Sequence, residues 1–234
     1  DQKDLTSENS IKISTKSVVN PSTHLIRGST LEASDEIKKH MENYATVILM
    51  SNLAGKAGAG IAPIVSRICK HEQKNLLSFT IMPFKFEKER IFQSGIALKR
   101  IRQDSKCTIV IDNDALLDSN PDLTQNQCYD ISNRAVESMM HSLKSSEISG
   151  DTNIMSTGRN NDNIESSLKD SLRMLYEDAP PNSIKRSMLY VYGSNNIPVG
   201  ILNTISNITG GTFDENSTHV EMSSDESKVI MLSS

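Results

Sequence analysis

Short apolar runs alternate with segments of helical spacing through the first half of the chain. The runs at residues 45–50, 76–82 and 107–111 are continuous and apolar, as is typical of strands buried on both faces of a parallel sheet. Residues 61–71 and 91–102 follow the first two runs and carry apolar side chains at helical spacing. Strands that alternate with helices predict right-handed crossovers and a parallel, Rossmann-like α/β sheet.

The second half of the chain is organised differently. A long central helix is predicted at about residues 125–144, and the following stretch, rich in Ser, Gly, Asn and Asp, is typical of a linker or loop. Beyond it a smaller α+β unit is predicted, so the domains are expected at residues 1–145 and 146–234. The remaining predicted elements are helices at 31–44, 164–176 and 199–208 and strands at 188–192, 218–222 and 228–232.

Composition narrows the functional classes. The formal net charge is −4 with both signs interspersed, which argues against a nucleic-acid partner and against a polybasic membrane patch. No apolar run approaches the roughly 18 residues of a membrane span, so no direct membrane insertion is expected. Three widely spaced cysteines argue against a disulfide framework or a zinc site. These features favour a cytoplasmic protein.

The segment AGKAGAG at residues 54–60 lies between the first predicted strand and the following helix. Gly55, Gly58 and Gly60 would allow a positive φ and a close approach to a ligand. The unpaired N–H groups at the start of the helix suit phosphate. A tight turn without any ligand fits the glycines equally well. The segment is neither a Walker loop nor a Rossmann fingerprint.

Two more polar groups follow predicted strands. In the segment PFKFEKER, Glu87 could bind a ribose hydroxyl and Arg90 a phosphate, although a solvated charge run at a helix start is the alternative. Asn113 follows the third strand, and its amide offers both a donor and an acceptor to a base edge. Ligands gather at the carboxyl ends of the strands in such sheets, so the three candidate segments are expected to meet there.

Together these segments resemble the FtsZ family, the prokaryotic relatives of tubulin. AGKAGAG followed by IAP matches the family string GGGTGTG followed by a small residue and Ala-Pro, and PFKFEKER matches PFxFEG…R. IDND followed by Leu116-Leu117 matches IPND with two leucines. Tyr129 and Asn133 have the spacing of the aromatic and the Asn or Asp of the family's central helix. Near the C-terminus, IMSTGR, MLYVYG and KVIML resemble the family's second domain.

The resemblance implies a guanine-nucleotide site, with GTP or GDP as cofactor and Mg²⁺ held through the phosphates. Glu87 would meet the ribose and Arg90 a phosphate, while Asn113 and Asn133 would hold the guanine with Tyr129 stacked against it. The phosphates would lie in the loop formed by Ala54, Gly55, Lys56, Ala57, Gly58, Ala59 and Gly60.

The chain also departs from the family pattern. The family's first strand and first glycine loop have no counterpart, since Asp1 aligns just after the second strand, so a truncated chain or the ordered part of a longer protein is expected. Ala57 and Ala59 replace phosphate-binding threonines, and Lys56 replaces a glycine. Lys56 would either compensate as a point charge or disfavour a turn that needs positive φ.

The catalytic Asn-x-Asp-x-x-Asp loop is not visible after the central helix. Glu147 and Asp151 are only weak substitutes, because a carboxylate in a loop is usually just solvated. The resemblance implies a GTPase, but the missing loop and altered phosphate loop predict weak or absent hydrolysis in this chain.

The leading hypothesis is an FtsZ/tubulin-like cytoskeletal protein that binds GTP or GDP and assembles head to tail into filaments, in cell division or cell shape. Its partner would be itself, with another FtsZ-like protein or a membrane-anchor adaptor as further candidates. The alternative is a degenerate, non-hydrolysing paralogue that regulates another filament. An unrelated phosphate-dependent metabolic enzyme is a third hypothesis, which the scattered histidines do not favour.

Overall fold

The computed structural model describes residues 10–15, 19–142, 152–158, 163–193, 197–222 and 227–234 of the chain. Its centre is a seven-stranded sheet in the order β1-β2-β3-β4-β7-β5-β6. All neighbouring strands are parallel except at β7, which runs antiparallel to both β4 and β5. The strands are β1 (Thr46–Asn52), β2 (Asn75–Ile81), β3 (Cys107–Ile111), β4 (Thr152–Thr157), β5 (Arg186–Gly193), β6 (Glu215–Met222) and β7 (Lys228–Ser233).

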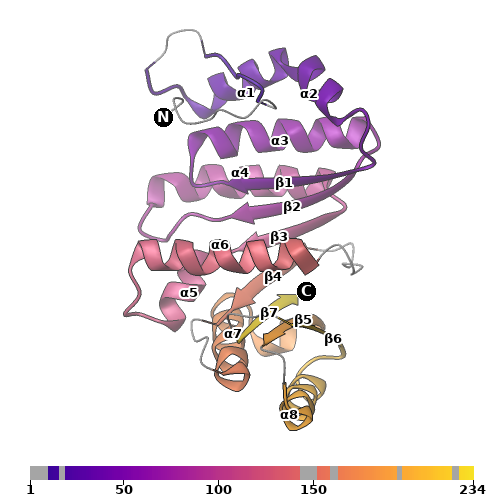
Figure 1. Ribbon diagram of the computed structural model, residues 1–234. Coiled ribbons are helices and arrows are strands. Elements are labelled where there is room, and N and C mark those ends of the chain that lie inside the picture. Colours follow the sequence, from indigo (N-terminus) through magenta and orange to yellow (C-terminus); the bar gives the residue numbers. More distant parts are fainter. Residues whose placement is uncertain (1–9, 16–18, 143–151, 159–162, 194–196, 223–226) are drawn as a thin grey trace.

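The helices alternate with the strands through the first half of the chain, as the apolar pattern predicts (Figure 1). They are α1 (Thr23–Glu32), α2 (Ser34–Met41), α3 (Lys56–His71), α4 (Lys88–Asp104), α5 (Asn113–Ser119), α6 (Gln125–Ser142), α7 (Ile164–Asp178) and α8 (Val199–Gly210), with a 3-10 turn at Pro181–Ser183.

The prediction of a single helix at residues 31–44 was wrong. Two helices occupy this region, and Ala33 lies between them. The first helix starts early because the side chain of Ser22 accepts a hydrogen bond from the Leu25 N–H and caps it. Its buried face is formed by Ile26, Ser29 and Thr30, and two of these side chains are polar. The apolar spacing that predicted a helix at residues 31–44 therefore did not reveal α1.

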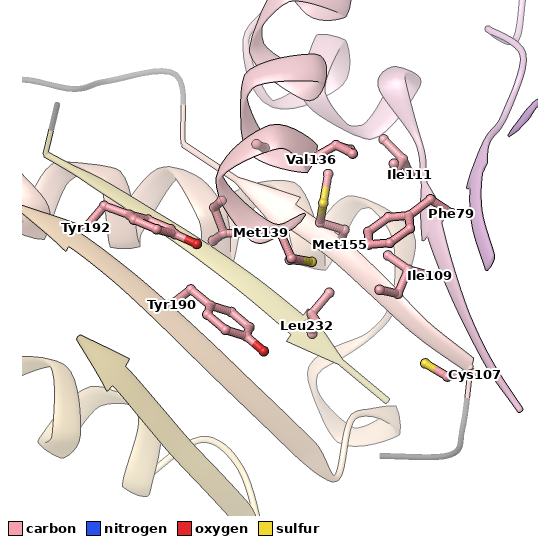
Figure 2. Packing of buried hydrophobic residues seen from close by; sticks show 12 residues of the cluster. Phe79, Cys107, Ile109, Ile111, Val136, Met139, Met155, Tyr190, Tyr192 and Leu232 are labelled. Atoms are coloured by element: carbon pink, nitrogen blue, oxygen red, sulfur yellow. The ribbon is translucent and has the colours of Figure 1, made fainter. Parts of the chain in front are cut away.

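The sheet has helices on both faces. Helix α6 packs on one face, where Ala135, Val136 and Met139 meet strand residues such as Phe79 and Tyr190 (Figure 2). Helices α3, α4, α7 and α8 cover the other face. Burial on both faces explains why β2 and β3 read as continuous apolar runs rather than as an alternation. The same expectation was wrong for β1, where Ile48 and Met50 are exposed.

One sheet runs through both halves of the sequence. Strands β3 and β4 pair in parallel from Thr108 with Thr152 to Ile111 with Met155. The predicted parallel α/β fold with a central helix is confirmed. No pattern in the sequence indicated that the predicted smaller α+β unit shares this sheet. The predicted domain boundary after residue 145 lies outside the described residues and stays a prediction.

A cluster of carboxyl groups joins α7 to the β3–α5 corner. Asp112 caps α5 by accepting a hydrogen bond from the Asp114 N–H (2.8 Å). Asp178, at the end of α7, keeps part of its side chain exposed, but its carboxyl bonds to Asp112. Burial of the carboxyl, then the charge of Asp112 and this hydrogen bond, raise the pKa of Asp178 from its ordinary 3.8 to about 8, against the opposing charge of Lys85.

We expect this pair to make stability depend on pH. A pKa raised in the folded state contributes stability that is fully present below the unfolded pKa near 3.8 and is lost as pH rises to about 8. Asp178→Asn keeps a neutral hydrogen-bonding group and should flatten the fall of the urea midpoint across that window. The exposed neighbour provides a control, Glu177→Gln, which should leave the wild-type slope unchanged. Equal slopes in all three proteins would contradict the assignment.

Candidate functional site

The turn from β1 into α3 leaves the start of the helix open to an anion. The side chain of Asn52 accepts a hydrogen bond from the Ala54 N–H (2.9 Å), which fixes the turn. Gly55 is the N-cap of α3, so no side chain caps the helix, and its first turn carries no acidic residue. The free N–H groups and the positive end of the helix dipole therefore point to where a phosphate could bind.

The glycines of this segment serve packing more than a special backbone conformation. The expectation of positive φ was wrong, because no described glycine has one. A Cβ on Gly58 would lie 2.0 Å from the Asn52 carbonyl oxygen, and a Cβ on Gly60 would lie 2.8 Å from Cγ2 of Ile26. Close approach of α3 to β1 and to α1 thus explains two of the glycines. Gly55 is the one that has ordinary space around it.

Lys56 lies in the first helical turn, and the described non-glycine residues with positive φ are Asn20 and Gln73. The idea that Lys56 disfavours a left-handed turn therefore does not apply. Its exposed side chain donates from Nζ to Oδ1 of Asn20 (2.8 Å). The ammonium group is thus held beside the start of α3 as a positive charge.

A hollow of about 530 Å³ opens at the start of α3. This volume falls within the range typical of small-molecule sites, about 300–1,000 Å³. Of the residues in the predicted phosphate loop, Ala57 is exposed and Gly58 and Gly60 face protein neighbours rather than this space. The hollow is lined by Asn20, Thr23, Leu53, Ala54, Gly55, Lys56, Ala59, Glu89, Arg90 and Gln93.

Glu87 and Arg90 form an ion pair beside this hollow. Oε1 of Glu87 accepts from Nη1 of Arg90 (2.6 Å), and Oε2 accepts from the Phe84 N–H (3.1 Å). The Glu87 side chain is only 12% exposed, so it braces the turn before α4. Arg90 lines the hollow, whereas Glu87 does not.

The residues predicted to hold the base lie elsewhere. Asn113 is fully buried; its Oδ1 accepts a hydrogen bond from Ser132, and its Nδ2 has no partner. Tyr129 packs edge-on against Phe84, with ring centres 5.5 Å apart. Asn133 lines a second hollow of about 350 Å³ between α6 and the sheet. Of the predicted phosphate-binding residues, the structure brings Ala54, Gly55, Lys56, Ala59 and Arg90 to the 530 Å³ hollow, but none of the base candidates.

Sequence reasoning missed the part of the site that precedes β1. Asn20 and Thr23 reach the hollow from the start of α1, and Gln93 reaches it from α4. The Asn20-Pro21 pair is typical of a turn, but it is the only signal in this segment. No motif in the sequence indicates that this turn lies beside the glycine turn. Among the described residues, no group of three or more His, Cys, Asp or Glu side chains could hold a metal ion. None of the described helices has the length and apolar character needed to cross a membrane.

The sequence of the chain is similar to those of known proteins. Residues 18–121 match the Tubulin/FtsZ family, GTPase domain. Cell division protein FtsZ 2 of Halobacterium salinarum is 27% identical over 108 residues, which cover 46% of this chain and 28% of that protein. Cell division protein FtsZ of Haloferax mediterranei is 31% identical over 117 residues, covering 50% and 30%. The chain thus spans less than a third of the curated relatives it matches.

Solved structures show the same fold. An FtsZ dimer from M. jannaschii aligns with a TM-score of 0.76 at 16% identity, covering 91% of this chain and 69% of that one. CetZ from Methanosaeta thermophila aligns with a TM-score of 0.69 at 15% identity, covering 89% and 66%. The fold is that of an α/β protein with a mostly parallel sheet, and its glycine-rich turn lies at the carboxyl end of the parallel strand β1. Residues 18–121 thus resemble the GTPase domain of the Tubulin/FtsZ family, and the described fold resembles that of the FtsZ and CetZ structures.

The packing role of Gly58 can be tested directly. Gly58→Ala should destabilise the fold by about 3 kcal/mol or more, because the new methyl group overlaps the Asn52 carbonyl oxygen. Gly95→Ala in α4 is the matched control, since a Cβ there has nothing within 4 Å, and it should stabilise by roughly 0.5–1 kcal/mol. Urea unfolding measures both. Similar effects at both positions would contradict the packing account.

Proposed function

We propose that the chain binds guanine nucleotide at the start of α3 and assembles head to tail into filaments in the cytoplasm. The observation that carries the proposal is the open helix start with Lys56 and Arg90 in one hollow of about 530 Å³. The family match at residues 18–121 includes every residue that lines this hollow. In addition, a structure with the same fold, CetZ1 from Haloferax volcanii, is a GDP-bound monomer, with a TM-score of 0.60 at 14% identity.

The phosphate half of the proposed site works through charge. Because Ala57 and Ala59 have no hydroxyl groups, the helix N–H groups and the Lys56 ammonium would hold the phosphates. Lys56 would exchange its bond with Asn20 for one with a phosphate oxygen. Arg90 has donors beyond the one that binds Glu87, and these could add a second contact.

The base half would lie on the other side of the end of β1. Ser51 lines the 350 Å³ hollow, and Leu53 and Ala54 line the 530 Å³ hollow. A nucleotide that crosses the strand end would place its phosphates at α3 and its base near Asn133 on α6. Glu87, Asn113 and Tyr129 lie along the same edge of the sheet and complete the proposed set. Mg²⁺, where present, would be held through the phosphates.

A non-hydrolysing paralogue is the second candidate. The alanines in the phosphate turn favour it, because hydrolysis needs positioned donors at the phosphates. The predicted position of the catalytic loop, and Glu147 and Asp151 with it, fall outside the described residues. Such a protein would bind nucleotide, hydrolyse it weakly or not at all, and regulate another FtsZ-like filament. A membrane-anchor adaptor is a further proposed partner. The proposed role is in cell division, as the names of the relatives suggest, or in cell shape.

The proposed role of Lys56 predicts a phosphate-dependent loss of affinity. Lys56→Gln should weaken GTP and GDP binding about 10- to 100-fold, the effect of one charge-assisted hydrogen bond, and should leave guanosine binding unchanged. A fluorescence titration with labelled nucleotides, and competition by guanosine, measures this. The exposed Lys99→Gln on α4 controls for net charge. Equal weakening in both variants would show that Lys56 has no specific role.

Self-assembly is tested separately. The chain should sediment as polymer with GTP, and less with GDP, if head-to-tail contacts form across the nucleotide face. Light scattering and electron microscopy of the pellet identify filaments. Phosphate release measured on the same samples separates the GTP-hydrolysing protein from the non-hydrolysing paralogue. Polymer that forms without phosphate release above the buffer blank favours the paralogue. No polymer with GTP, GDP or no nucleotide counts against self-assembly but leaves nucleotide binding intact.

A further inference from the structure

The second hollow, between α6 and the sheet, has an apolar floor. Its volume is about 350 Å³, within the range of about 300–1,000 Å³ that is typical of small-molecule sites. Apolar side chains from three neighbouring strands line it, namely Met50 of β1, Phe79 and Ile81 of β2 and Ile111 of β3. Met50 is 56% exposed, so the floor stays open to a ligand on the side of β1. An open apolar surface of this kind suits a planar ring system.

Polar side chains line the same hollow from one stripe of α6. Asn133, Glu137 and His141 follow one another at intervals of four residues, so they lie on one face of the helix and one turn apart. The helix is fixed to the sheet between them, because Ala135 and Met139 are fully buried in the core. The hollow thus combines an apolar floor from the strands with a polar wall from the helix.

Glu137 brings a carboxylate to this wall. Its side chain is exposed, and within the described ranges it forms no ion pair, either with His141 one turn away or with another basic residue. An ionised carboxylate only accepts hydrogen bonds, and its two oxygens lie in one plane. Glu137 therefore offers the hollow a pair of acceptors, and the amide of Asn133 adds a donor and an acceptor one turn away.

We propose that Glu137, together with Asn133, reads the guanine base and sets the nucleotide specificity of the chain, an inference that rests on the proposed nucleotide site. Guanine presents two neighbouring donors, N1–H and the N2 amino group, beside the acceptor O6. A carboxylate accepts from both donors at once, and the Asn133 amide can donate to O6. Adenine carries an acceptor at N1, which a carboxylate repels, so adenine nucleotides are disfavoured.

Inosine nucleotides test this contact, because they lack the N2 amino group but keep N1–H and O6. The wild-type protein should bind GDP about 10-fold more tightly than IDP, the effect of one charge-assisted hydrogen bond. Glu137→Gln places a donor against one of the two guanine donors, so GDP affinity should fall about 10- to 100-fold and the preference for GDP over IDP should disappear. Isothermal titration calorimetry measures both affinities.

A matched control lies on the same helix. Asp130 is exposed on α6 and does not line the hollow. Asp130→Asn makes the same change of charge and of functional group as Glu137→Gln, and it should leave the GDP affinity and the preference over IDP at their wild-type values. An equal loss in both variants would assign the effect to net charge and overturn the role of Glu137.

Guanosine separates this inference from the proposed phosphate site. It carries the base without phosphates, so Glu137→Gln should abolish its binding while Lys56→Gln should leave it intact. GDP that binds equally well to the wild-type protein and to Glu137→Gln, or equal affinities of the wild-type protein for GDP and IDP, overturns the role of Glu137 but leaves the site at α3 in place. No binding of GDP, IDP or guanosine to the wild-type protein overturns both proposals.

Discussion

The parallel pairing of β3 with β4 under α6 holds the molecule together. That pairing joins two halves of the sequence into one sheet, and the same helix covers residues from both halves. Met139 is fully buried among Phe79, Met155 and Tyr190, which belong to strands from each half. Backbone hydrogen bonds and an apolar core thus act at the same place. Loss of either would separate the two halves of the sheet.

The start of α3 depends on a second close contact. Because Gly58 has no Cβ, α3 can begin directly against the Asn52 carbonyl oxygen, at the end of β1. Gly60 lets Ile26 of α1 pack on the same helix, which brings Asn20 and Thr23 to the hollow. The AGKAGAG segment resembles a ligand-binding loop, but its glycines first allow α3 to pack closely against β1 and α1. Two features of this segment remain available to a ligand, namely the uncapped start of α3 and the positive charge of Lys56.

The sequence was sufficient for the elements that carry apolar periodicity. Strands β2 and β3 were predicted because burial on both faces leaves continuous apolar runs, whereas β1 carries such a run although one of its faces is exposed. Helix α1 was missed because Ser29 and Thr30 form part of its buried face. Lys56 and Arg90, which the motifs grouped as phosphate-binding candidates, both line the 530 Å³ hollow. The contribution of Asn20 to the hollow was not predicted, because it depends on how α1 packs against α3.

The positive charges at the 530 Å³ hollow follow from the same packing. Lys56 is held by the neutral amide of Asn20, and Arg90 is bound by Glu87. These contacts do not use every donor, because an ammonium group has three donors and a guanidinium group has five. Both side chains line the hollow at the uncapped start of α3. The packing of α1 and α4 against α3 therefore leaves positive charge with spare donors where the proposed phosphates would bind.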